Sequence, residues 1–93
     1  MYNGLVMNDD ITALRKQINL LDEQLVRLLN ERAAVAVEIG RLKAAAGVQP
    51  YDPARERAVL EHIVGLNKGP LGKGDIEDIF ATIITACREI QSR

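Results

Sequence analysis

The chain has 93 residues, which is enough for one small domain with a modest hydrophobic core. Its 12 basic and 13 acidic side chains give a formal charge of −1, so no basic surface for nucleic acid or an anionic membrane is expected. One cysteine and one histidine exclude an internal disulfide and a metal cluster built on these residues, and they suit a reducing cytoplasm. No stretch has the length and apolar character of a membrane span or a signal peptide.

The first predicted element is a very long helix from Asp9 to about Ala46. Apolar residues recur there in steps of three and four, which is the seam of a helix that packs on other helices. The first six seam residues are Ile11, Leu14, Ile18, Leu21, Leu25 and Leu28. Residues 1–8 precede this pattern, and we expect them to form a disordered N-terminal tail.

The seam is interrupted once, at Arg32, and its apolar spacing resumes at Val35, Ile39 and Leu42. A cation within an apolar stripe costs free energy unless an anionic group meets it there. Arg32 is therefore the first candidate for binding an anionic ligand.

The length of this helix predicts an obligate homodimer. About 37 residues at 1.5 Å per residue give a rod of roughly 55 Å. A compact chain of this size has a radius of gyration of only about 12 Å. The rest of the chain is too small to cover the helix, and its continuous apolar stripe favours packing on a second copy.

A second helix is predicted after a break that contains Gly47 and Pro50. Asp52 is a suitable N-cap, and the proline that follows it suits the first helical position. The apolar residues keep helical spacing as far as about Asn67, where this helix is expected to end.

A flexible, glycine-rich loop at 68–74 separates this helix from a third, which we expect Asp75 to cap. The apolar positions of the third helix are Ile76, Ile79, Phe80, Ile83, Ile84, Cys87 and Ile90. No segment alternates like a strand. The predicted fold is all-α, with one very long helix and two shorter ones per protomer.

Two cations of the long helix share one face. Arg32 and Lys43 are eleven residues apart, or about three turns, so they point within roughly 20° of each other. They stand about 16 Å apart along the axis, and two long side chains leaning inward can hold a small dianion. Arg15 lies seventeen residues before Arg32, roughly 25 Å along the rod. If Arg15 is functional, it must reach a site on a partner subunit.

Further polar candidates stand where the shorter helices begin and end. Asp52, Arg55 and Glu56 open the second helix, where the helix N-terminus and an arginine favour an anionic group. Gln91, at the end of the third helix, offers an amide that can donate a hydrogen bond to an uncharged oxygen.

Four stretches together resemble the all-helical class of chorismate mutase: ALRKQINLLDEQLVRLLNER, VAVEIGRLK, YDPARER and IFATIITACREIQ. The resemblance covers about residues 10–91 and defines a mutase domain at 9–93. The block GVQPYDPARER and the loop NKGP resemble most the mutase domains at the N-terminus of some bacterial DAHP synthases. The resemblance implies an intertwined homodimer with two active sites. It also implies the isomerisation of chorismate to prephenate, with no cofactor and no metal.

The resemblance assigns roles residue by residue. Arg15, reaching the partner's site, and Arg32 would hold the substrate carboxylates, while Lys43 and Gln91 would face the ether oxygen. The remaining roles belong to residues of the second and third helices. Arg55 would steady the substrate or the loop, and Glu56 would bind the ring hydroxyl. Asp52 would complete the acidic pair, and Cys87 would form part of the wall. Some relatives have a serine where this chain has Cys87, so a hydroxyl contact there is not expected.

Other interpretations stay open at this point. Taken singly, each charged residue also fits an exposed or capping role. Isochorismate-pyruvate lyase shares this scaffold and a similar set of cations. A regulatory module that senses chorismate or prephenate for a DAHP synthase also fits the resemblance. In every case a cytoplasmic protein with no membrane or nucleic-acid partner is expected.

Overall fold

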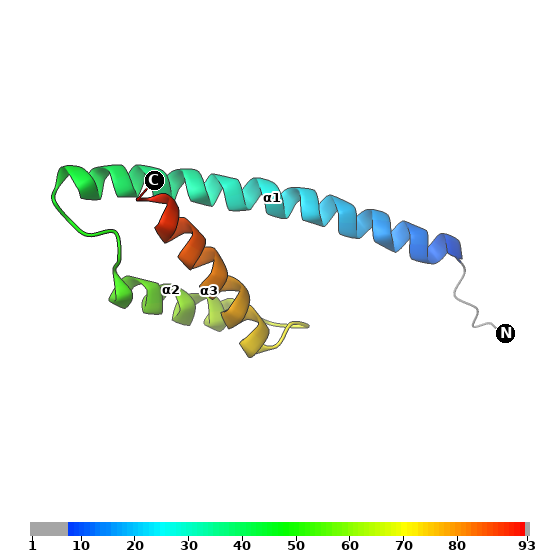
Figure 1. The fold of residues 1–93 in the computed structure, drawn as a ribbon. Helices are drawn as coiled ribbons and strands as arrows, with labels where there is room; N and C mark the ends of the chain where they lie inside the picture. The colour runs from blue at the N-terminus through cyan, green and yellow to red at the C-terminus, as the bar shows by residue number, and fades with distance from the viewer. Residues whose placement is uncertain (1–7, 93) are drawn as a thin grey trace. The chain divides into compact units, whose positions relative to one another are not determined.

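The computed structural model describes residues 8–92, and this part of the chain contains three helices and no strand (Figure 1). Helix α1 spans Asn8–Ala45, α2 spans Pro53–Leu66 and α3 spans Lys73–Ile90. The predicted all-α class is confirmed. Helix α1 begins one residue before Asp9, so Asn8 belongs to the helix. The rest of the predicted tail, residues 1–7, lies outside the described residues.

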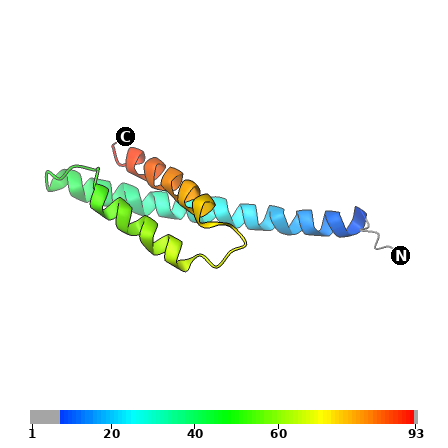
Figure 2. The same cartoon turned by 90° about the horizontal axis from the view of Figure 1, so that it is seen from below.

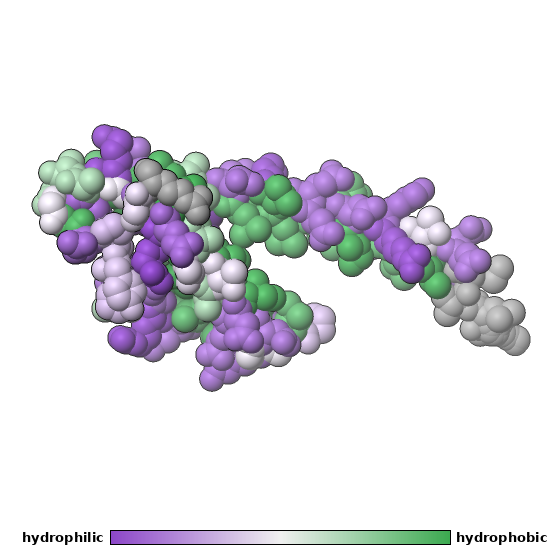
Figure 3. Space-filling view, in the orientation of Figure 1, coloured by the Kyte–Doolittle hydropathy of each residue, from purple (hydrophilic) through white to green (hydrophobic). Residues whose placement is uncertain are grey.

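The chain divides into two units after Glu31, within the sequence of α1. In the first unit, the described residues 8–31 are all helical, and their large apolar side chains are uncovered (Figure 3). Leu14, for example, is 58% exposed. The exposed set contains the whole predicted seam and three further residues beside it: Leu20, Val26 and Leu29. This stretch therefore carries apolar surface on more than one side.

The second unit, residues 32–92, contains the end of α1 together with α2 and α3. Helices α2 and α3 pack against each other (Figure 2). Few residues of these helices are buried, and most of them are small. Ala36 and Gly40 come from α1, and Ile84 and Cys87 come from α3. A limited core of this kind leaves much of the facing surface of the three helices available for a cavity.

The start of α2 agrees with its sequence. Asp52 is the N-cap, and its Oδ1 accepts a hydrogen bond from the backbone N–H of Arg55 at 3.1 Å. Pro53 occupies the first helical position, where its missing N–H leaves no hydrogen bond unmade. The helix ends at Leu66 with Asn67 as the C-cap, as predicted.

The predicted cap of α3 is wrong. The helix begins at Lys73, and its N-cap is Gly72, which makes no side-chain hydrogen bond. Glycine is also accepted at this position, and the Gly72 carbonyl accepts from the backbone N–H of Ile76 at 3.1 Å. Asp75 instead lies in the first turn, where its negative charge complements the helix dipole.

The connection between α2 and α3 is consequently shorter than the predicted 68–74 loop. The side chain of Asn67 ties it together, because its Nδ2 donates to the Leu71 carbonyl at 2.8 Å and its Oδ1 accepts from the Gly69 N–H at 3.2 Å. Gly69 has a positive φ of 81°, which a residue with a side chain rarely adopts. Within residues 8–92, no helix is long and apolar enough to cross a membrane.

Candidate active site

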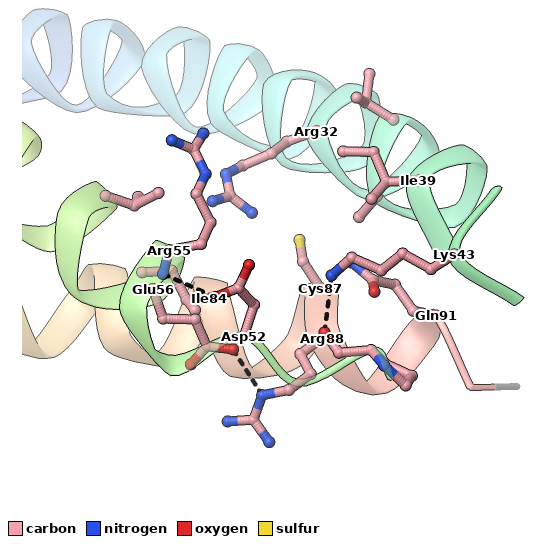
Figure 4. A pocket seen from close by; sticks show the side chains of 14 residues that line it. Arg32, Ile39, Lys43, Asp52, Arg55, Glu56, Ile84, Cys87, Arg88 and Gln91 are labelled. Carbon is pink, nitrogen blue, oxygen red and sulfur yellow. Dashed lines mark hydrogen bonds and ion pairs between the residues drawn. The ribbon is translucent and has the colours of Figure 1, made fainter. Parts of the chain in front are cut away.

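A cavity of about 340 Å³ opens in the 32–92 unit (Figure 4). This volume is in the range of small-molecule sites. Fourteen residues line it, and they come from the end of α1, from the residues around the start of α2, and from the end of α3. Seven of the eight predicted site residues are among them: Arg32, Lys43, Asp52, Arg55, Glu56, Cys87 and Gln91.

The charges of the cavity suit a doubly negative ligand. Four cationic side chains line it, contributed by Arg32, Lys43, Arg55 and Arg88, against the two carboxylates of Asp52 and Glu56. The other walls are largely apolar, so a bound anion would lose water and interact more strongly with the cations. The cavity can therefore hold a small dianion and restrain its shape.

Helix α1 contributes one face to the cavity, at Arg32, Val35, Ala36, Ile39 and Lys43. Three of these residues belong to the predicted seam, and Lys43 shares their face as predicted, but the seam residue Leu42 does not line the cavity. Arg32 and Lys43 are both half-buried, and the Lys43 Nζ donates to the Pro50 carbonyl at 2.9 Å. The ammonium group is thus held beside the loop that leads to α2, instead of extending freely into solvent.

Helix α2 presents its first turn to the cavity. Asp52 uses one carboxylate oxygen as the helix cap, and the other points toward the cavity in Figure 4. The capping role and a position in the cavity wall therefore coexist in one residue. Arg55 and Glu56 follow it on the same turn, so this short segment supplies both signs of charge.

Helix α3 contributes Cys87 and the helix-ending Gln91. Cys87 is only 7% exposed, and its thiol forms part of the wall. Gln91 packs against Gly40 of α1 so closely that a Cβ at Gly40 would lie 2.7 Å from the Gln91 Cβ. The buried Oε1 of Gln91 has no hydrogen-bond partner within the described part of the chain. One end of this amide is therefore available to a ligand.

Sequence analysis missed Arg88, which also lines the cavity. Its Nε donates to the Glu56 Oε2 at 2.8 Å, and its guanidinium carbon lies 4.7 Å from the centre of the Tyr51 ring. The signal was present in the spacing, because Arg88 follows Ile84 by four residues and precedes Gln91 by three. The rule that singled out Arg32, a cation in an apolar helix face, applies to Arg88 as well.

The structure does not bring Arg15 into this cavity. Arg15 belongs to the 8–31 unit and is not among the lining residues. Its predicted role in a partner's site stays a prediction.

Comparison with known proteins identifies the family. The sequence matches the chorismate mutase type II family over residues 14–92. The chain belongs to this family. A structure of chorismate mutase (form II) from Thermus thermophilus is 36% identical in sequence and superposes with a TM-score of 0.87. The match covers 89% of this chain and 94% of that one. A second structure, form I from the same organism, is 38% identical with a TM-score of 0.81, covering 83% of this chain and 96% of that one.

Longer relatives carry the same mutase domain beside another enzyme. A bifunctional chorismate mutase/prephenate dehydratase of Pseudomonas aeruginosa is 40% identical over 88 residues, covering 89% of this chain. One from Aquifex aeolicus is 37% identical over 89 residues, covering 91% of this chain. This chain spans about a quarter of their length, 24% and 25%. The second domain in these relatives is a prephenate dehydratase, whereas the resemblance in sequence had suggested a DAHP synthase.

Proposed function

We propose that this chorismate mutase domain converts chorismate to prephenate. The observation that carries the proposal is that four cationic side chains and the Gln91 amide line a single cavity of small-molecule size. Chorismate is a dianion of suitable size, and its rearrangement is intramolecular. The reaction breaks a carbon–oxygen bond while a carbon–carbon bond forms, and it needs neither a nucleophile nor a proton transfer.

The cavity can accelerate such a reaction in two ways. The first is to hold the enolpyruvyl arm over the ring, which removes conformational freedom before the barrier is reached. All three of Arg32, Arg55 and Glu56 line the cavity. In this proposal the two arginines bind and steady the substrate through its carboxylates, and Glu56 accepts a hydrogen bond from its ring hydroxyl. Cys87 and Ile84 form an apolar part of the wall, which we expect to leave little space for the extended conformer.

The second way in which the cavity can accelerate the reaction is to stabilise negative charge on the ether oxygen as its bond to the ring lengthens. Lys43 supplies a positive charge, and Gln91, which lines the same cavity, supplies an amide NH2 group that can donate a hydrogen bond to this oxygen. Fixed donors of this kind are worth more inside a dry cavity than in water. Asp52 completes the rim by capping α2, which keeps Arg55 and Glu56 on an ordered first turn.

The decisive test is whether the purified chain converts chorismate to prephenate, measured as the disappearance of chorismate and the appearance of prephenate. Lys43→Ala should lower kcat/KM at least about 100-fold, because it removes charge stabilisation at the breaking bond. Lys68→Ala is the matched control, since Lys68 is an exposed lysine that does not line the cavity. Near-normal turnover by the Lys43 variant would refute the assignment. Release of pyruvate from isochorismate, with no formation of prephenate from chorismate, would indicate the lyase instead.

The dimer is part of the same proposal. Residues 8–31 expose apolar side chains on more than one side, which is expected of a helix that other helices surround in an assembly. We expect a second copy to cover them, with Arg15 of each protomer reaching the cavity of the other. A shared site of this kind adds a fifth cation to each cavity.

Subunit complementation tests this arrangement. Arg15→Ala and Arg32→Ala homodimers should each be nearly inactive. When the two variants are mixed and allowed to exchange, each heterodimer regains one intact site and one doubly defective site. Random pairing should therefore restore about a quarter of the wild-type activity. No recovery in a mixture shown to contain heterodimers would place Arg15 and Arg32 in the same chain's site.

A partner enzyme of the aromatic pathway, including a DAHP synthase, stays a prediction, as does a cytoplasmic location. Relatives in which this domain is joined to prephenate dehydratase favour an association with another enzyme of the pathway. Co-purification with a DAHP synthase, and altered inhibition of that synthase, would support the predicted regulatory role.

A further inference from the structure

Arg88 is the one charged residue of the cavity to which the proposed mechanism gives no role. It lies on α3 and forms an ion pair with Glu56 of α2, 32 positions earlier in the sequence. The side chains of Arg88 and Glu56 are only 32% and 23% exposed, so solvent screens the pair less than it would a pair at the surface.

The orientation of Arg88 is fixed on two sides. Its Nε donates to Glu56, while its guanidinium carbon lies over the ring of Tyr51, 4.7 Å from the ring centre. Tyr51 directly precedes the cap of α2. A planar guanidinium can stack on a ring and donate from its edge at the same time, which the ammonium group of a lysine cannot do.

The pair uses only one oxygen of the carboxylate. Arg88 bonds to Oε2 of Glu56, and no hydrogen bond to Oε1 occurs within residues 8–92. Figure 4 shows the Arg88 guanidinium below the Glu56 carboxylate, with the dashed bond between them. The bond therefore restrains the carboxylate and leaves one acceptor free.

We infer that Arg88 is a positioning residue, which holds Glu56 so that its free oxygen accepts the hydrogen bond of the substrate's ring hydroxyl. This inference rests on the proposed function. A loosely held carboxylate would sample orientations that do not meet the hydroxyl, and a misplacement of about 1 Å at a reacting site costs on the order of 100-fold in rate.

The test compares two substrates. Arg88→Gln should lower kcat/KM for chorismate about 10-fold to 100-fold. For a chorismate analogue with hydrogen in place of the ring hydroxyl, the same substitution should change kcat/KM less than about twofold, because Glu56 then has no hydroxyl to meet. In a Glu56→Gln background, Arg88→Gln should add little further loss for chorismate.

A matched control is the pair formed by Arg41 and Glu38, which also joins an arginine to a glutamate but is more than half exposed and lies outside the cavity. The Arg41 Nε donates to the Glu38 carboxylate at 3.1 Å, and this hydrogen bond together with the charge of Arg41 lowers the pKa of Glu38. Arg41→Gln should leave kcat/KM unchanged for both substrates.

Two further variants keep the inference testable if Arg88→Gln folds poorly. Arg88→Lys retains the charge but loses the planar donor, and it should lose rate with chorismate alone. Tyr51→Ala removes the ring beneath the guanidinium and should give a smaller loss of the same pattern. Equal losses with both substrates would overturn the inference, since Arg88 would then act on the fold or on the carboxylates. An unaffected Arg88→Gln variant would overturn it too, whereas a wild-type chain inactive on chorismate would overturn the proposed function itself.

Discussion

Helix α1 carries the same apolar period through two regions, of which only the second lines the cavity. Between residues 8 and 31 the seam is uninterrupted, its leucines and isoleucines are exposed, and none of its residues lines the cavity. From Arg32 onward the same face holds two cations, and it forms one wall of that cavity. An exposed apolar face without cations therefore indicates association, whereas cations inserted into that face indicate a ligand.

The largest expected effect is in the first region. Leu25→Lys places a charge in the middle of the exposed seam, and a two-fold dimer would bring two copies of it to the interface. Burying one leucine contributes about 1.5–3 kcal/mol, and an unpaired buried charge costs more than that. The variant should sediment as a monomer at micromolar concentration and retain less than about a hundredth of the wild-type kcat/KM.

Glu23→Lys is the matched control for this experiment. It introduces the same side chain two positions earlier, on the polar side of the helix opposite the seam. Dimer and activity should both survive. If both variants dissociate, or if neither does, the apolar face of residues 8–31 is not the interface.

The sequence predicts those parts of the fold and the site that depend on local periodicity. Arg32 and Lys43 could be placed together because helical geometry alone puts residues eleven apart on one face. The cap at Asp52 followed from the adjacent proline and from the residue type. The cap of α3 was missed because Asp75 has a suitable side chain, while Gly72 relies on its backbone alone.

Contacts between helices distant in sequence could not be predicted in the same way. The ion pair of Arg88 with Glu56 depends on how α3 crosses α2, which no spacing within one helix specifies. The role of Gly40 is similar. In the sequence it is an unfavourable residue within a long helix, and only the packing of Gln91 against it shows why a side chain would not fit.

Gly40→Ala should therefore separate helix formation from site geometry. Alanine favours the helix by roughly 0.8–1.0 kcal/mol over glycine. Its Cβ would, however, lie 2.7 Å from the Cβ and 3.0 Å from the backbone Cα of Gln91, so the end of α3 must shift. We expect kcat/KM to fall about tenfold while thermal stability changes little, because the amide no longer reaches the ether oxygen.

Gly65→Ala is the matched control for Gly40→Ala. Gly65 is also helical, but a Cβ there would meet no atom within 4 Å. This variant should gain up to about 1 kcal/mol of stability and keep full activity. An equal response of activity to the two substitutions would mean that the contact between Gly40 and Gln91 does not position the amide.

The smallest effect is expected at Cys87, which tests whether the charges of the cavity or its neutral wall govern the rate. Cys87→Ser places a hydroxyl at a position that is only 7% exposed, and an unsatisfied buried hydroxyl costs about 1–3 kcal/mol. A helical serine can offset part of this cost by donating to the carbonyl four residues earlier, here that of Ile83. A net cost of about 1 kcal/mol would lower Tm by roughly 4–8 °C in a domain of this size.

Because the thiol of Cys87 carries no charge that could attract a dianion, kcat/KM of the Cys87→Ser variant should change less than about threefold. A loss comparable to that of Lys43→Ala, measured in the folded variant at the same protein concentration, would show that the wall at Cys87 controls the reaction as strongly as the cations do.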